Sequence, residues 1–122
     1  MIYGIGTDIV LISRIKNTEA FAKKILSNKE FILWKDYLPG KQKTFLAKQF
    51  AGKEAIAKAL GTGFQNGIFP KDIEILRNDL GKPYISAQGS LKNVFTDLEI
   101  TSSHVSIADE TDYVVAFAII EK

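Results

Sequence analysis

The first half of the chain has apolar residues three and four positions apart, the spacing of helices that bury one side. An apolar run with two glycines, residues 2–10, comes first and predicts a strand. The spacing then predicts three helices, at residues 11–26, at residues 29–37, and from residue 41 or 42 to residue 60. A Leu-Pro-Gly break separates the second helix from the third.

The second half instead alternates apolar and polar residues, the period of strands that bury one face. The predicted elements are the hairpin strands 72–77 and 84–87 around a turn at 78–83, a short helix at 90–98, and the antiparallel strands 99–108 and 113–120. Because helices come early and strands late, the sequence predicts an α+β fold in which helices pack against an antiparallel sheet. One domain is expected to span residues 1–122.

The end of the longest predicted helix is rich in small residues. Small side chains let another backbone or a ligand approach closely, although alanine is also the best helix former. Gly61 is a natural helix cap, and Gly63 is a second position free of side-chain constraint. The turn of Gly61, Thr62 and Gly63 is therefore either a cap alone or part of a phosphate-binding loop.

Composition limits the possible chemistry. With 46% hydrophobic and 25% charged residues, the chain is ordinary for a globular protein with a real core. It has no cysteine, which excludes disulfides, thiolate zinc sites and cysteine nucleophiles. Its one histidine, His104, excludes a multi-histidine metal site within one chain. Catalysis must then rely on acids, lysines and the backbone.

The expected localisation and the distribution of charge limit the kinds of partner that the protein can bind. The chain has no apolar run long enough to span a bilayer and no secretory leader, so we expect a cytoplasmic protein with no membrane partner. Residues 1–60 hold eleven Lys and Arg against five Asp and Glu, whereas residues 61–122 hold five against nine. The early helices thus predict a basic face, suited to nucleic acid, a membrane surface or an acidic protein. A solvated lysine-rich face without a partner would give the same pattern.

The long helix also carries a carboxylate between two lysines. Glu54 and Lys58 are four residues apart and project from one face, with Lys53 beside them. A carboxylate can hold a divalent cation while a lysine meets phosphate oxygens, but Mg²⁺ then needs a second acid. Asp8 is the best candidate, because an acid in a buried strand is costly unless it is paired or bound to a metal. The alternatives are a solvated Glu54–Lys58 pair and an Asp8 that caps a turn.

His104 shares one face of its predicted strand with Ser102 and Ser106. Such a polar stripe either lines a cleft or faces solvent.

Four motifs now occur in order along the chain. They are Gly4-Ile5-Gly6-Thr7-Asp8-Ile9, Phe50-Ala51-Gly52-Lys53-Glu54-Ala55 through Gly61-Thr62-Gly63, Gly81-Lys82-Pro83, and Ser103-His104-Val105-Ser106-Ile107. Together they span almost the whole chain and closely resemble the short holo-acyl-carrier-protein synthases of the 4′-phosphopantetheinyl transferase superfamily.

The resemblance implies an enzyme of fatty acid biosynthesis that moves 4′-phosphopantetheine from coenzyme A to a serine of apo-acyl carrier protein and releases adenosine 3′,5′-bisphosphate. It implies that Asp8 and Glu54 ligate Mg²⁺ and that Lys58 lies beside the transferred phosphate. It also implies a homotrimer with each cofactor site between neighbouring subunits, and no nucleic-acid partner.

Further binding residues follow from the same resemblance. His104 is expected near the diphosphate end of coenzyme A. The other residues expected to contact the cofactor are Lys53, Lys58, Gly61, Thr62, Gly63, Lys82 and Pro83. The basic residues expected to contact acidic carrier protein are Arg14, Lys16, Lys23 and Lys24.

The chain departs from the family pattern in two ways. Gln49 stands where family members often carry arginine, and Arg14 is the one arginine among first-helix positions that are commonly arginine. Lysine gives a point charge where arginine gives a bidentate fork, so the contacts with carrier protein are expected to differ.

Phosphoryl transfer depends mostly on charge neutralisation and alignment. The base for the serine proton is Glu54, directly or through a bound water, or else Asp8; Lys58 serves only if its pKa is strongly depressed.

Two rival classes of protein make different predictions. A small basic nucleic-acid-binding α+β module would bind with steep salt dependence and without Mg²⁺ or coenzyme A, and it leaves Asp8 and Glu54 unexplained. A purely structural trimer subunit would bind no ligand.

Overall fold

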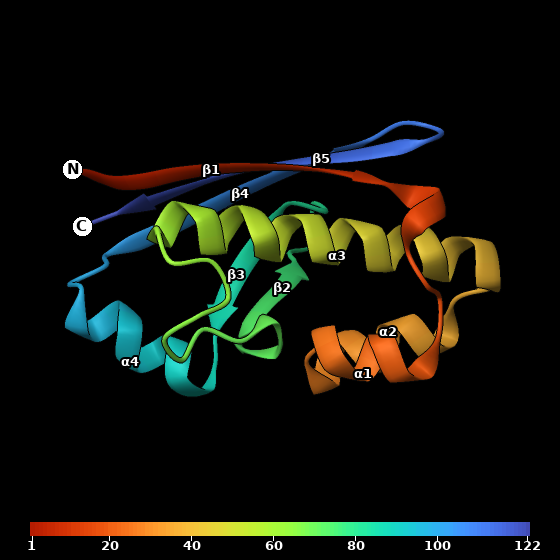
Figure 1. Ribbon diagram of the computed structural model, residues 1–122, viewed down its shortest axis with the longest axis horizontal. Coiled ribbons are helices and arrows are strands. Elements are labelled where there is room, and N and C mark those ends of the chain that lie inside the picture. The colour runs from red at the N-terminus through yellow and green to blue at the C-terminus, as the bar shows by residue number, and fades with distance from the viewer.

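The computed structural model describes all residues from 1 to 122, and its long helix α3 (Pro39–Leu60) lies between two layers (Figure 1). One layer is a three-stranded antiparallel sheet in the order β1-β5-β4. The other layer contains the remaining helices and a two-stranded sheet, β2-β3. The predicted α+β class is confirmed.

The remaining elements follow one another along the chain. They are β1 (Ile2–Leu11), the 3-10 turn η1 (Ile12–Arg14), α1 (Glu19–Ile25), α2 (Asn28–Asp36), the 3-10 turn η2 (Pro70–Asp72), β2 (Ile73–Arg77), β3 (Pro83–Ala87), α4 (Gly89–Asp97), β4 (Ser102–Asp109) and β5 (Tyr113–Glu121). No helix is both long and apolar enough to cross a membrane.

Strand β5 is the centre of the three-stranded sheet, and its side chains alternate between two environments. Val114, Ala116, Ala118 and Ile120 are buried against α3, whereas the residues between them point to the outer face. The two chain ends lie side by side (Figure 1), and the Lys122 N–H donates to the Met1 carbonyl at 2.8 Å. The sheet is thus one apolar layer that α3 covers on one face only.

Two glycines bring β1 into direct contact with α3. A Cβ atom on Gly4 would lie 1.9 Å from the carbonyl oxygen of Ala59, and one on Gly6 would lie 2.0 Å from that of Ala55. Two residues of a strand and four residues of a helix advance by similar distances, roughly 6 to 7 Å. Strand and helix therefore stay in step while running in opposite directions, and the next inward position of β1 is Asp8.

The predicted helix 11–26 was wrong over its first half. Strand β1 continues to Leu11, η1 makes one turn, and the α-helix begins only at Glu19. Thr18 caps the helix, because its hydroxyl accepts a hydrogen bond from the Phe21 N–H. The side chain of Asn17 bonds to Trp34 and Gln42 and holds this segment in a loop.

Other predicted boundaries shift by a few residues. Helix α3 begins at Pro39, since a proline fits the first helical position, where no N–H is needed. Strand β4 begins at Ser102, because Glu99 has a φ of +58° and interrupts the extended chain. The hairpin β2–β3 and the pairing of β4 with β5 form as predicted.

Candidate active site

The two acids and the lysine singled out by their chemistry meet where β1 crosses α3. The Lys58 ammonium donates to Asp8 Oδ1 at 3.0 Å and to the Thr7 carbonyl at 3.1 Å. The Asp8 side chain is 15% exposed and the Lys58 side chain 51% exposed. Glu54, one helical turn before Lys58, is half-buried and close enough to Asp8 for the two charges to interact.

The pKa of Glu54 lies above its ordinary value. Partial burial is the main cause, the nearby negative charge of Asp8 adds to it, and the Lys58 ammonium opposes both. Two carboxylates that repel each other on a partly open surface favour a bound cation, which would relieve the repulsion.

The donor set also suits magnesium. The side chains of Asp8 and Glu54 both offer carboxylate oxygens, which are hard ligands. No group of three or more His, Cys, Asp or Glu side chains is placed to hold a metal, so the protein would supply only these two ligands. Mg²⁺ keeps several waters or phosphate oxygens among its ligands, so two protein carboxylates are enough. The residues present therefore fit a magnesium ion shared with a phosphate-bearing substrate.

Lys53 does not belong to this cluster, and the prediction that it contacts the cofactor is wrong. Its side chain is fully buried, and its ammonium donates to Glu30 Oε1 at 2.7 Å and to the carbonyls of Pro70 and Ile73, each at 2.8 Å. Burial lowers the pKa of Lys53, while the Glu30 charge opposes that shift. All three N–H bonds are used inside the protein, so none is left for a ligand.

The signal that identifies Lys53 as buried is present in the sequence. The inward positions of α3 follow a spacing of three and four: Leu46, Gln49, Lys53, Ile56 and Leu60. Lys53 lies on this stripe, and its partner Glu30 is the third residue of α2, where it forms a capping box with Ser27. What single-sequence reasoning lacks is the pairing between two helices far apart in the chain.

Gln49, the departure from the family pattern, belongs to the same buried network. Its amide donates to Glu30 Oε2 and, at 2.9 Å, to the Ile75 carbonyl. Glu30 also accepts from the N–H groups of Ser27 and Ile75. No buried side-chain nitrogen or oxygen lacks a partner. Gln49 therefore ties α2, α3 and β2 together.

The glycine turn after α3 closes the helix. Gly61 has a φ of +87° and Gly63 a φ of +63°, and the N–H of each donates back to a carbonyl of the last turn. The Thr62 hydroxyl donates to the Gly63 carbonyl. The capping interpretation is confirmed, and a contact of this turn with the cofactor stays a prediction.

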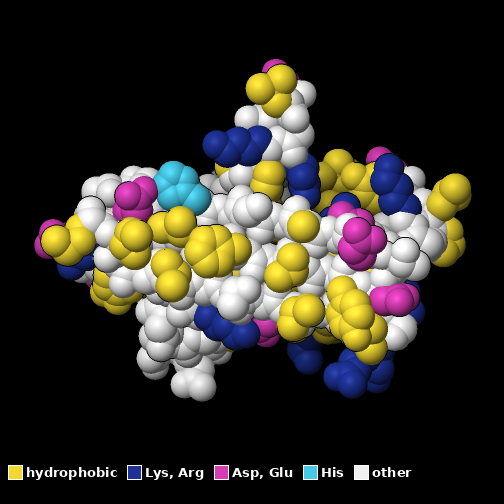
Figure 2. Space-filling view, turned by 90° about the horizontal axis from the view of Figure 1, so that it is seen from above, with side chains coloured by type: hydrophobic (Ala, Val, Ile, Leu, Met, Phe, Trp, Pro, Cys, Tyr) yellow, Lys and Arg dark blue, Asp and Glu magenta, His cyan; other side chains and the backbone are white.

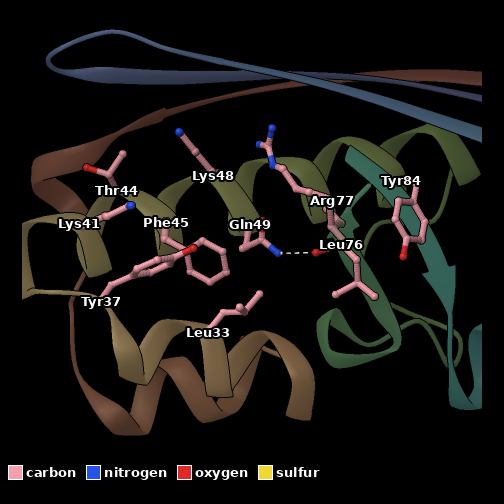
Figure 3. A pocket seen from close by; sticks show the side chains of 11 residues that line it. Leu33, Tyr37, Lys41, Thr44, Phe45, Lys48, Gln49, Leu76, Arg77 and Tyr84 are labelled. Atoms are coloured by element: carbon pink, nitrogen blue, oxygen red, sulfur yellow. Dashed lines mark hydrogen bonds between the residues drawn. The ribbon is translucent and has the colours of Figure 1, made fainter. Parts of the chain in front are cut away.

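A cavity of about 480 Å³ lies between α2, the first half of α3 and the β2–β3 hairpin (Figure 3). Leu33 of α2 and Tyr37, which follows this helix, form one wall, and Arg77 and Tyr84 of the β2–β3 hairpin form another. Pro83 pairs with Arg77 in this hairpin, so Lys82 and Pro83 lie at its turn end. None of the residues of the Asp8 cluster lines this cavity.

Both lysines that line the same cavity come from α3. Lys41 lies 4.7 Å from the centre of the Tyr37 ring, and Lys48 pairs with Asp109 at 3.1 Å. Sequence reasoning missed Lys41, Lys48 and Arg77, because they come from distant segments and belong to none of the motifs. The cavity combines three cations with aromatic rings, which suits a ligand with phosphates and a planar base.

His104 lies on the outer face of the sheet, away from α3. It is 2.7 Å from Glu121 Oε1, which also accepts from the Ser102 hydroxyl at 2.9 Å. The hydrogen bonds from His104 and Ser102 lower the pKa of Glu121. The prediction that His104 and Ser102 share a face is confirmed; the contact of His104 with a cofactor stays a prediction.

The residues predicted to contact carrier protein are all exposed and lie in or near α1. Arg14 lies in η1, Lys16 in the following loop, and Lys23 and Lys24 in the last turn of α1. A mainly apolar groove of about 520 Å³ runs beside Lys24. The apolar residues that line it are Phe21, Ile25, Phe50, Phe64, Phe69 and Pro70.

Comparison with known proteins agrees with this geometry. Residues 4–118 match the family model of the 4′-phosphopantetheinyl transferase superfamily. A holo-[acyl-carrier-protein] synthase from Hydrogenovibrio crunogenus is 45% identical over 99% of this chain and 98% of its own.

Solved structures show the same relationship. The crystal structure of a holo-[acyl-carrier-protein] synthase from Neisseria meningitidis superposes with a TM-score of 0.93 at 41% identity, covering all of both chains. A relative from Bacillus anthracis, solved in complex with coenzyme A (3′,5′-ADP), superposes with a TM-score of 0.86 at 32% identity over 100% of this chain and 98% of that one. This chain therefore belongs to the holo-[acyl-carrier-protein] synthase family of the 4′-phosphopantetheinyl transferase superfamily.

Proposed function

We propose that this enzyme transfers the 4′-phosphopantetheine group of coenzyme A to a serine hydroxyl of apo-acyl carrier protein and releases adenosine 3′,5′-bisphosphate. The observation that carries the proposal is the meeting of Asp8 and Glu54, which are 46 positions apart in the sequence, beside the half-exposed ammonium of Lys58. The activity of relatives 40–45% identical over nearly the whole chain supports it. We propose further that the reaction serves fatty acid biosynthesis and that the enzyme is cytoplasmic.

In the proposed reaction the serine oxygen attacks the phosphorus next to the pantetheine arm. A new P–O bond forms, and the bond from that phosphorus to the bridging diphosphate oxygen breaks, so the leaving group departs as a phosphate of adenosine 3′,5′-bisphosphate. Magnesium bound by Asp8 and Glu54 supplies charge neutralisation on the diphosphate.

Residues of this chain perform the other tasks. The Lys58 ammonium stabilises negative charge on phosphate oxygens, since its side chain is half-exposed beside the two acids. Glu54 accepts the serine proton, directly or through a water, since its carboxylate lies beside Asp8 and Lys58 at the same site. The buried Lys53–Glu30 pair keeps the neighbouring turn of α3 fixed.

We propose that the cofactor site is completed between subunits of a homotrimer. The acids lie at the β1–α3 contact beside the C-terminal half of α3, whereas the cavity with Lys41, Lys48 and Arg77 lies beside its N-terminal half. Coenzyme A carries one 3′-phosphate at its adenosine end and a diphosphate in the middle, so one subunit would hold the adenosine end and its neighbour the diphosphate. Under this proposal His104, Lys82, Pro83 and the glycine turn contact the cofactor within the assembled trimer.

The outer face of the sheet supports assembly. Apolar side chains gather along it (Figure 2), among them Ile5, Ile9, Val115 and Phe117, each more than 40% exposed. Exposed apolar patches of this kind mark association surfaces. Sedimentation of the wild-type protein should give three times the 13.5 kDa chain mass.

A substitution on the central strand tests that assembly. Phe117→Asp should dissociate the trimer, because it places a charge in the middle of the apolar face. Ile32→Asp is the matched control: Ile32 is an equally apolar residue, 63% exposed, but on α2 in the other layer. A wild-type protein that sediments as a monomer, or a trimeric Phe117→Asp variant, would contradict the assembly.

We propose that acidic carrier protein docks on α1. The exposed cations Arg14, Lys16, Lys23 and Lys24 supply the charge, and the apolar groove beside Lys24 supplies an adjoining hydrophobic contact. Charge complementarity of this kind steers association and raises the encounter rate.

The proposed reaction is tested by incubating the protein with coenzyme A, Mg²⁺ and apo-acyl carrier protein and weighing the product. Carrier protein should gain the mass of one phosphopantetheine arm, and adenosine 3′,5′-bisphosphate should appear in equal amount. A chelator should stop the reaction, and a carrier protein with alanine at the acceptor serine should gain nothing. Absence of any mass gain with the intact carrier protein would refute the proposed activity.

A further inference from the structure

The contact between Lys58 and Asp8 has the form of an occupied cation site. Two oxygens converge on the Lys58 nitrogen, Asp8 Oδ1 at 3.0 Å and the Thr7 carbonyl at 3.1 Å. The Thr7 backbone is fixed, because β1 pairs with β5 at this position and Gly6 leaves no space between β1 and α3. The Thr7 carbonyl oxygen and the Asp8 backbone therefore hold their places with or without the lysine.

The lysine, in contrast, is free to leave. Its side chain is 51% exposed, whereas that of Asp8 is only 15% exposed. A pair of this kind is worth little in free energy, typically below about 1 kcal/mol, since water competes well for an exposed ammonium. A divalent cation attracts a carboxylate more strongly than an ammonium does, because it carries twice the charge.

We propose that Lys58 is a resident counter-ion, which occupies the cation site on Asp8 until the metal arrives and is then released to bind phosphate oxygens of the substrate. This inference rests on the proposed metal role of Asp8 and Glu54. It assigns Lys58 two successive partners: Asp8 in the free enzyme and phosphate in the loaded one. Metal binding and phosphate binding are coupled as a result, because the first frees the group that the second uses.

The proposal predicts an unusual pair of effects for one substitution. Lys58→Met should tighten metal binding in the absence of coenzyme A, since the metal no longer has to displace an ammonium. The expected gain is about two- to fivefold, the range for losing a partly exposed ion pair. The same variant should lose transfer activity, since the phosphate contact is gone.

The experiment measures Mn²⁺ binding by electron paramagnetic resonance of the free ion, with full-length protein and no coenzyme A. Lys48→Met is the matched control, because it removes a lysine of the same helix that is likewise paired with an aspartate, Asp109, at 3.1 Å. It changes the net charge equally but should leave Mn²⁺ affinity at the wild-type value.

A second measurement uses the unmodified protein. Trace acetylation of lysines, quantified by mass spectrometry, should rise at Lys58 as Mg²⁺ is added and stay constant at Lys48. Equal Mn²⁺ affinity in wild type and Lys58→Met, with Lys58 acetylation unaffected by Mg²⁺, would overturn the counter-ion role and leave the metal site standing. Failure of both proteins to bind Mn²⁺ would overturn the counter-ion role together with the metal assignment.

Discussion

Gly6→Ala should separate β1 from α3 and so pull Asp8 away from Glu54. The added Cβ would lie 2.0 Å from the Ala55 carbonyl oxygen, and ordinary contact begins at 3.4 Å, so the two backbones must part by about 1.4 Å. The obstacle is helix backbone, which cannot rotate out of the way as a side chain can. Gly6 thus has no room for even the smallest side chain.

The size of the effect follows from that distance. Overpacking of this kind costs about 1–3 kcal/mol, and for a chain of this length each kcal/mol lowers Tm by about 4 °C. We therefore expect Tm to fall by roughly 4–12 °C. Because a misplacement of about 1 Å can cost roughly a hundredfold in rate, kcat/KM measured well below Tm should fall by about that factor.

Circular dichroism gives Tm, and the mass-gain assay gives kcat/KM. Gly40→Ala is the control, because a Cβ there would meet nothing within 4 Å; it should keep full activity and lose no stability. A Gly6→Ala variant with wild-type Tm and activity would refute the close contact of β1 with α3 as the feature that positions Asp8.

Other predictions concern single charges. Lys53→Met leaves Glu30 as an uncompensated buried charge, so urea denaturation should show a loss of about 3–5 kcal/mol in the free energy of unfolding; a loss below about 1 kcal/mol would contradict the buried pair. Because the pKa of Glu54 is raised, Mn²⁺ affinity should weaken on acidification at a pH above 4.5, and a midpoint at or below 4.5 would argue against Glu54 as a ligand. By the same shift, ionised Glu54 opposes folding, so Glu54→Gln should raise Tm of the metal-free protein at neutral pH, with the gain vanishing below pH 4.5. Reversing the charges of Arg14 and Lys24 should raise KM for carrier protein at least about tenfold; an equal loss of coenzyme A affinity would show that the basic face has another role.

The sequence could predict the meeting of Asp8 with Glu54 because it follows from chemistry. An acid on the inward face of a strand needs a partner, and a helix with a carboxylate and a lysine four residues apart offers one. The glycines at positions 4 and 6 also indicate that β1 lies against a helix, because only a strand without side chains at its inward positions can lie directly on a helix backbone.

Lys53 shows where this reasoning stops. Its position on the buried stripe of α3 was readable, but its partner Glu30 lies 23 residues away on another helix. A lone sequence does not reveal which of several acids a buried lysine meets. The early helix was misplaced for a similar reason, because the loop before α1 is held by side-chain bonds from Asn17 to Trp34 and Gln42, and not by local propensity.

The cavity between α2, α3 and the β2–β3 hairpin could not be predicted either. Lys41, Lys48 and Arg77 come from one helix and a hairpin strand, and only the folded chain brings them together. Under the proposal that this cavity holds the adenosine end of coenzyme A, its position relative to Asp8 and Glu54 depends on how the subunits assemble. No pattern along a single chain specifies that assembly.

The most direct test of the central claim compares the wild-type protein with Asp8→Asn and Glu54→Gln in the transfer reaction. The two variants keep the size of each side chain and remove one carboxylate charge at a time. With coenzyme A and Mg²⁺, wild-type protein should convert apo-carrier protein to the heavier product, while both variants remain folded by circular dichroism and convert almost none. Conversion by either variant at the wild-type rate would contradict the claim that these two acids together hold the catalytic metal.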